Sequence, residues 1–160
     1  MKGFISYAHD DHVAFRHFRK DIRSTERAYG IKFWADSGIN AGSCWRQDIA
    51  DAIDEASVHL LLCTPAFFDS DYIFGTELPL IDKKCDAGAL VIPVILKRCS
   101  WSTFVGVLQA VPTAENRRLT PITEWEPSEN GFDAARHQID NAIAGRFQLT
   151  PRSPFRWGKR

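Results

Sequence analysis

The run VHLLLCT at residues 58–64 constrains the fold of this chain more than any other stretch. Its apolar side chains occupy odd and even positions alike, so both faces of a strand formed there need cover. Strands that are buried on both faces are typical of parallel sheets with helices on each side. We therefore expect residues 58–64 to form a central strand of an α/β sheet.

Short apolar runs elsewhere supply the other strands. We expect strands at residues 3–8, 31–35 and 89–96, and a weaker fifth strand at residues 119–123. Pro93 lies within residues 89–96 and has no N–H to donate to a neighbouring strand, so we expect a bulge there.

Helical patterns separate these strands. Apolar side chains recur at helical spacing in three segments: Ala14, Phe15, Phe18 and Ile22; Trp45, Ile49, Ile53 and Ala56; and Phe132, Ala135, Ile139, Ile143 and Phe147. We expect Asp10 or Asp11 to cap the first helix and Gly30 to end it, and Ser43 to cap the second. Thr76 would cap a further helix at residues 77–87, and Gly88 would end it. Pro79 would lie in the first turn of that helix, where proline is tolerated.

This alternation predicts a flavodoxin-like, doubly wound, five-stranded parallel sheet in the order 2-1-3-4-5, with helices on both faces. Ligands of such sheets bind beyond the carboxyl ends of the strands, at the switch point between strands one and three. Residues 7–10 and 64–67 would line that crevice, and Glu77 would begin a helix at the same edge. A helix N-terminus would keep the Glu77 carboxylate ionised.

The composition is that of an ordinary globular domain without a bulk charge. Lys and Arg together number 20, as do Asp and Glu, so charge gives no reason to expect nucleic acid or a membrane as a partner. The acidic start after MKGFISYAH does not suit a signal peptide, and the four cysteines form no CxxC pair, so we expect reduced thiols and a cytoplasmic location. His9 and His12 have no third metal ligand nearby, and no GxxxxGK[ST] loop supports an ATPase.

Four stretches of the chain resemble the Toll/interleukin receptor (TIR) domain family, particularly its prokaryotic members. They are FISYAHDD, FWADSGINAGSCWRQDIADAI, LLLCTPAFFDSDYIFGTEL and VIPVILKRCSW, in the order and spacing of the family's motifs. The resemblance implies a TIR domain at residues 1–147, followed by a basic, proline-containing tail or linker at residues 148–160.

Many prokaryotic members of this family cleave NAD+ into nicotinamide and ADP-ribose or a cyclised form. The resemblance therefore implies NAD+ as substrate and no bound cofactor or metal. The catalytic glutamate of the family falls on Glu77, whereas the tryptophan often found one turn earlier is replaced by Ile73. The expected substrate contacts are Tyr7, Ala8, His9, Trp34, Asn40 and Trp101. The expected assembly loop, which would contact other TIR domains in a homo-oligomer, contains Gly38, Ile39 and Gly42.

Other interpretations of the same residues remain open. Trp45, like Trp34 and Trp101, could stack on an adenine or nicotinamide ring, but it lies on the apolar stripe of its helix, which favours core packing. Asp10 and Asp11 fit helix capping. An acidic pair after strand one also suits a phosphoacceptor receiver domain, but Thr64 stands where that class needs an aspartate. A non-catalytic TIR scaffold that only recruits other TIR domains is the main alternative function, and nucleoside chemistry on another substrate is a third.

Overall fold

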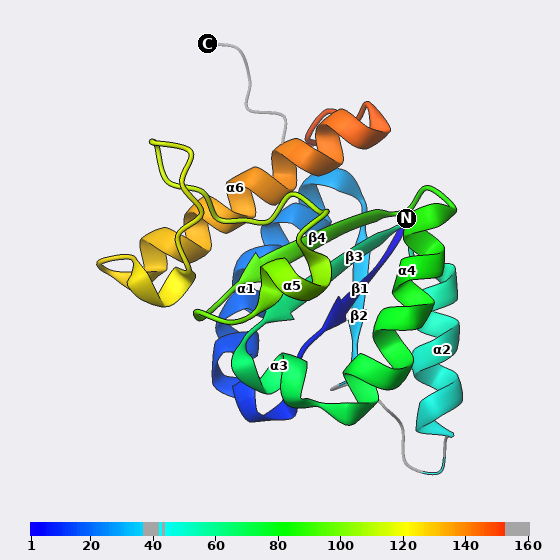
Figure 1. The fold of residues 1–160 in the computed structure, drawn as a ribbon. Helices are drawn as coiled ribbons and strands as arrows, with labels where there is room; N and C mark the ends of the chain where they lie inside the picture. Colours follow the sequence, from blue (N-terminus) through cyan, green and yellow to red (C-terminus); the bar gives the residue numbers. More distant parts are fainter. Residues whose placement is uncertain (37–41, 43, 153–160) are drawn as a thin grey trace.

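The fold is a parallel sheet with helices packed on both faces (Figure 1). The computed structural model describes residues 1–36, 42 and 44–152. Four parallel strands pair in the order β2-β1-β3-β4, and they are β1 (Lys2–Ser6), β2 (Lys32–Ala35), β3 (Val58–Cys63) and β4 (Leu90–Ile95). The two central strands are therefore β1 and β3, and the switch point lies between them.

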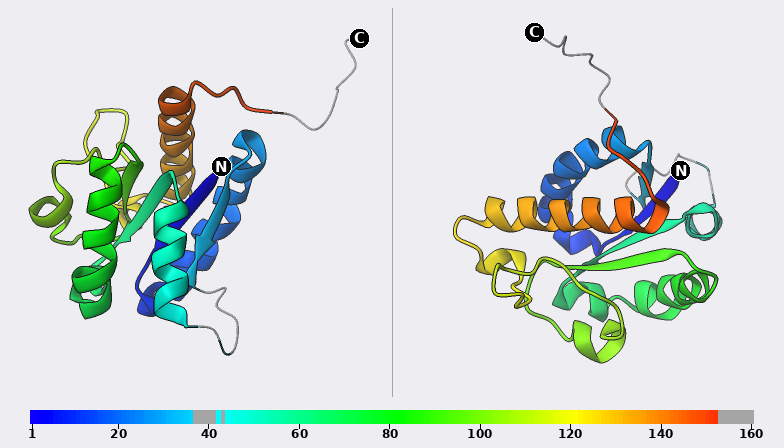
Figure 2. Two further views of the ribbon diagram at one scale, coloured as in Figure 1. Left: turned by 90° about the vertical axis from the view of Figure 1, so that its right-hand side faces the viewer. Right: turned by 90° about the horizontal axis from the view of Figure 1, so that it is seen from above.

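Helices cover the sheet in two layers, and the right view of Figure 2 shows the strands between them. Helices α1 (His12–Tyr29) and α6 (Ser128–Phe147) pack together on one face. Helices α2 (Trp45–Glu55), α4 (Leu78–Asp86) and the short α5 (Trp101–Val105) cover the other face. The remaining elements are α3 (Pro65–Asp69), the π-helical η3 (Ile73–Glu77) and the 3₁₀ turns η1 (His9–Asp11) and η4 (Ile122–Glu124).

The central strand is as the sequence predicts. All six residues of β3 are buried, and β3 lies between β1 and β4. Val58, Leu60 and Leu62 face the core under α1 and α6, while Leu61 and Cys63 face the core under α2 and α4. The non-alternating apolar pattern thus reflects a strand with a packed helical layer on each side.

The predicted fifth strand is absent from the described residues, so the expected order 2-1-3-4-5 is wrong in its last member. The place beside β4 is taken by a one-residue parallel bridge between Val94 and Val111. Residues 119–123 instead contribute one antiparallel bridge, from Leu119 to Thr113, and then the start of η4. Pro112 and Pro121 explain why pairing stops there, because neither can donate a ladder hydrogen bond.

The bulge expected at Pro93 is also wrong. Register between β3 and β4 runs without interruption, with Leu61 opposite Pro93. The Pro93 carbonyl accepts a hydrogen bond from the Val111 N–H at 2.9 Å, so the backbone polar groups of Pro93 face the outer edge of β4. The donor that proline lacks would point away from β3, and an edge strand tolerates that loss.

Glycines end two helices as predicted. Gly30 follows α1 with a φ of 66°, and Gly88 follows α4 with a φ of 96°. In this left-handed region a Cβ atom is strained, which explains why glycine occupies both ends. Helix α2 begins after Cys44, and the predicted cap Ser43 lies outside the described residues.

In the part of the chain that the structure describes, no helix combines the length and the apolar character needed to cross a membrane.

Candidate active site

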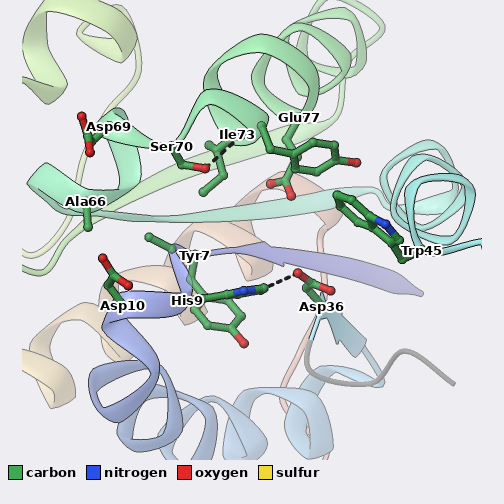
Figure 3. A pocket seen from close by; sticks show the side chains of 12 residues that line it. Tyr7, His9, Asp10, Asp36, Trp45, Ala66, Asp69, Ser70, Ile73 and Glu77 are labelled. Atoms are coloured by element: carbon green, nitrogen blue, oxygen red, sulfur yellow. Dashed lines mark hydrogen bonds and ion pairs between the residues drawn. The ribbon is translucent and has the colours of Figure 1, made fainter. Parts of the chain in front are cut away.

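A cleft of about 380 Å³ opens at the carboxyl ends of β1 and β3, where the strand order reverses. It is lined by Tyr7, Ala8, His9, Asp10, Asp36, Trp45, Ala66, Asp69, Ser70, Tyr72, Ile73 and Glu77. Figure 3 shows the Glu77 carboxylate pointing into this cleft, with Trp45 beside it and His9 and Asp36 across from it. Four of the expected site residues, Tyr7, Ala8, His9 and Glu77, therefore meet in one cleft.

Glu77 does not begin a helix, contrary to the sequence-based expectation. The helical segment starts at Asp71, where the Ser70 hydroxyl accepts the Ile73 N–H at 3.3 Å, so Ser70 rather than Thr76 caps it. The helix widens into the π turn η3, whose last residue is Glu77, and continues as α4. Pro79 accounts for the widening, because it has no N–H to donate to the Gly75 carbonyl and its ring crowds that carbonyl. Single π turns of this kind are frequent at functional sites.

Burial, rather than a helix dipole, controls the charge of Glu77. The residue is 5% exposed, and this burial raises the pKa of its carboxyl group from 4.5 to about 7. The Ser6 hydroxyl donates a hydrogen bond to Oε2 of Glu77 and lowers that pKa, while the nearby charge of Asp36 raises it and that of His9 lowers it. The cleft thus holds a carboxyl group that is close to half ionised at neutral pH.

His9 and Asp36 form a pair across the cleft from Glu77 (Figure 3). Nε2 of His9 lies 2.6 Å from Oδ2 of Asp36, and the pair joins the segments that follow β1 and β2. The Asp36 side chain is 18% exposed, whereas that of His9 is largely exposed. Because the two neighbours act on the pKa of Glu77 in opposite directions, the pair limits the net charge that Glu77 faces.

Two aromatic rings form the wall of the cleft next to Glu77. Trp45, the first residue of α2, is 41% exposed, so its interpretation as a core residue is wrong. Its ring lies 4.7 Å from the ring of Tyr72, centroid to centroid, at an interplanar angle of 53°. The other apolar residues of its helix stripe, Ile49 and Ile53, are fully buried as expected.

Asp11 does not cap α1 through its side chain, which makes no capping hydrogen bond. The buried carboxylate instead accepts a hydrogen bond from the Thr64 hydroxyl and pairs with Nζ of Lys97 at 3.5 Å. These three residues follow β1, β3 and β4, so Asp11 ties the ends of three strands together. The Thr64 hydroxyl also accepts the Phe67 N–H and so caps α3.

The other expected site residues do not line this cleft. Trp34 stacks on Phe4 at 5.7 Å and lines a separate hollow beside β2, and Trp101 lines a hollow near Arg98 and Leu119. Gly42 is exposed, with a φ of 86°. Asn40, Gly38 and Ile39 lie outside the described residues.

Sequence reasoning missed Ser6, Asp36 and Tyr72 as neighbours of Glu77. Ser6 is the last residue of β1 and Asp36 follows β2, so the expected strand order could have placed both at the ligand-binding edge. Tyr72 carried no such signal, because its position depends on the π turn. Among residues 1–36, 42 and 44–152, no three His, Cys, Asp or Glu side chains lie together as a metal site would require.

Comparison with known proteins identifies the family. A family model described as TIR domain matches residues 4–141. The chain belongs to the TIR domain family. An uncharacterized protein, y4lF, of Sinorhizobium fredii is 33% identical over 153 residues, which is 94% of this chain but 46% of that protein. This TIR chain thus spans about half the length of that relative.

A solved structure supports the same fold. The TIR domain of the Toll-related receptor TRR-2 from Hydra magnipapillata is 16% identical to this chain, with a TM-score of 0.57. The match covers 88% of this chain and 97% of the Hydra chain. At this identity the similarity concerns the fold alone.

Proposed function

We propose that this TIR domain cleaves the bond between nicotinamide and ribose in NAD+, releasing nicotinamide and either ADP-ribose or a cyclised product. The observation that carries the proposal is the Glu77 carboxylate, buried, hydrogen-bonded by Ser6 and directed into the cleft between β1 and β3. Buried titratable groups with a raised pKa in a cleft are candidates for catalysis.

The chemistry needs one anion rather than an acid and base pair. Nicotinamide leaves NAD+ from a cationic state, so its departure requires no proton from the protein. Nicotinamide takes the bonding electron pair, the ribose gains oxocarbenium character as the bond breaks, and a carboxylate beside it stabilises that charge. Water then forms the new bond to C1′ and releases a proton to solvent, which gives ADP-ribose; in a cyclised product a nucleophilic group of the same molecule forms that bond and releases the proton. Glu77 is the residue of the cleft that we assign to this role, and Ser6 holds one of its oxygens in place.

The raised pKa of Glu77 is compatible with this role. In the free protein the carboxyl group is close to half protonated near neutral pH, because its pKa is about 7. A bound cation next to the carboxylate favours the ionised form, so the substrate itself would draw the group into its reactive state. We expect kcat/KM to rise with pH through about 7, since kcat/KM reports ionisations of the free enzyme.

The test is incubation of concentrated protein with NAD+, followed by chromatographic separation of nicotinamide and ribosyl products. Glu77→Gln keeps the shape of the side chain but removes the anion, and turnover should fall by about 100-fold or more. Glu129→Gln, an exposed glutamate of α6, is the matched control and should keep full activity. Equal turnover of the native protein and Glu77→Gln would reject Glu77 as the catalytic group.

We also propose that activity depends on self-association, because a contact between two TIR domains would complete or open the cleft. Specific activity should then rise with protein concentration, because the competent state is populated only in the assembly. A dilution series paired with sedimentation measures this. Constant specific activity from a monomeric protein would contradict it.

One observation favours the second candidate, a scaffold that only recruits other TIR domains. Phe74, Phe104 and Val107 are exposed near α4 and α5, by 44%, 48% and 96% respectively. The rings of Phe74 and Phe104 are in edge contact at 5.0 Å, so they form one aromatic surface. Exposed apolar patches of this kind often bind other proteins. A concentrated, oligomeric sample that releases no nicotinamide would favour this function over catalysis.

A further inference from the structure

Trp45 is exposed at a position where its own helix offers burial. Two other members of its apolar stripe, Ile49 and Ile53, are buried completely under the sheet, yet Trp45 at the first turn is 41% exposed. Its ring lines the cleft instead of the core (Figure 3). An indole left partly in water at the wall of a cleft is available to a ligand.

Tyr72 fixes the orientation of that indole. The two rings meet at 53° with centroids 4.7 Å apart, a tilted contact in which aromatic pairs are favourable. Tyr72 belongs to the same helical segment as Glu77. Burial raises the pKa of the Tyr72 hydroxyl, and the nearby charge of Glu77 raises it further. The flat face of Trp45 is therefore held near the carboxylate by the segment that carries it.

The electrostatics of this corner favour a cation. The carboxyl groups of four residues line the cleft with Trp45: Asp10, Asp36, Asp69 and Glu77. The guanidinium of Arg46 lies over the Trp45 ring, 5.4 Å from its centroid, but Arg46 is not among the residues that line the cleft. Ile73, one turn before Glu77, also lines the cleft but offers no ring.

We propose that Trp45 is the stacking surface for a flat, cationic heteroaromatic ring of the pyridinium class, with Tyr72 positioning the indole and Glu77 balancing the charge. The aromatic surface is thus supplied by α2, not by the helical segment that carries the glutamate. The choice of the pyridinium class rests on the proposed function, because the leaving group of NAD+ is such a ring. Trp45 would determine how tightly that ring is held.

The experiment uses 1-methylnicotinamide, a pyridinium carboxamide without a ribose, titrated into the full chain by calorimetry. Trp45→Leu removes the ring but keeps an apolar side chain, and should weaken binding by about tenfold or more. Trp45→Phe keeps a smaller ring and should lose only a few-fold in affinity. Trp101→Leu, which changes a tryptophan in a separate hollow, should bind as the native chain does.

Thermal unfolding of each variant confirms that it is folded. The proposal is overturned if the native chain does not bind 1-methylnicotinamide, if Trp45→Leu binds it equally well, or if Trp101→Leu loses as much. Neutral nicotinamide should bind more weakly than the methylated cation, and equal affinity would also refute a site that selects for charge.

Failure of this proposal is distinct from failure of the proposed function. The probe has no glycosidic bond, so its binding does not depend on cleavage. Binding that requires Trp45, together with no release of nicotinamide from NAD+, leaves the ring site standing and rejects the hydrolase. Cleavage of NAD+ with the same KM in Trp45→Leu rejects the ring site and leaves the hydrolase.

Discussion

Replacing Glu77 with glutamine should raise the stability of the fold relative to the native chain as the pH increases, and should lower turnover by about 100-fold or more. The reason is that burial makes the charged carboxylate less favourable in the folded chain than in the unfolded chain. A folded-state pKa above the unfolded value means that the native state binds more protons between the two values. The stabilising contribution of protonated Glu77 is therefore complete below 4.5 and is lost as the pH rises through about 7.

The size of the effect follows from the two pKa values. The pKa of Glu77 is raised from 4.5 to about 7. Each unit of difference corresponds to about 1.4 kcal/mol, so ionised Glu77 destabilises the fold by roughly 3 kcal/mol at alkaline pH. Part of this cost already appears near pH 5, so the change between about pH 5 and pH 8 is roughly 2.5 kcal/mol. Glutamine has no such dependence, although its own amide adds a constant difference at every pH.

The assay is urea unfolding of the native protein, Glu77→Gln and the exposed-site control Glu129→Gln at about pH 5 and pH 8. The free energy of unfolding of Glu77→Gln, minus that of the native chain, should increase by roughly 2.5 kcal/mol between those pH values. Subtraction cancels the other titrating groups and the constant effect of the amide. A difference that stays the same at both pH values would refute the buried, raised carboxyl group, and an increase in Glu129→Gln of similar size would show that the effect is not specific to the cleft.

Three further substitutions test the surroundings of Glu77 and another buried titratable group, His59. Ser6→Ala removes the hydrogen bond that lowers the pKa of Glu77, so the acid limb of the pH–rate profile should move to higher pH and kcat should fall several-fold; an unmoved limb would show that the hydroxyl does not act on the carboxylate. Asp36→Asn removes the like charge, so the same limb should move to lower pH, and movement in the other direction would contradict a repulsion between Asp36 and Glu77. His59 is fully buried, and its ring nitrogens have no hydrogen-bond partner of good geometry among the described residues. Burial lowers the pKa of its imidazole from 6.5 to about 4. The stability contributed by neutral His59 is therefore present above pH 6.5 and is lost as the pH falls through about 4. His59→Leu should reduce the loss of unfolding free energy on acidification from about pH 6.5 to below pH 4 by roughly 3 kcal/mol, measured by urea unfolding. An unchanged loss would show that other groups cause it.

The fold was predictable where a local sequence pattern reflects the burial or the backbone conformation of a segment. The apolar run of β3 identified a strand buried on both faces, and Gly30 marked the end of α1 through its backbone freedom. The fifth strand failed because a weak apolar run says nothing about whether its backbone donors reach β4. Val111 makes that contact in a single bridge, and the neighbouring prolines end it.

The site was predictable in position but not in its physical character. Strand order and the family resemblance brought Tyr7, His9 and Glu77 to one edge, and the cleft contains all three. The sequence predicts Thr76 as the helix cap because threonine is a common cap, but Ser70 takes that role and the π turn places Glu77 beyond the first turn of the helix. Sequence periodicity assumes regular helix geometry, so it had no means of showing that the carboxylate is buried.

Two features of the cleft oppose the stability of the fold, and a bound cationic ring would offset both. Glu77 is a carboxylate removed from water, and Trp45 is an indole left partly in it. An unfavourable placement alone does not identify a functional residue, since His59 is also buried without good hydrogen bonds from the described residues and packs near Phe4 in the core. The difference is that Glu77 and Trp45 line the same cavity with complementary properties, a negative charge and an aromatic face. A ligand with a positive flat ring would neutralise the first and cover the second, so binding energy at this cleft would come from the two groups whose placement the fold alone does not favour.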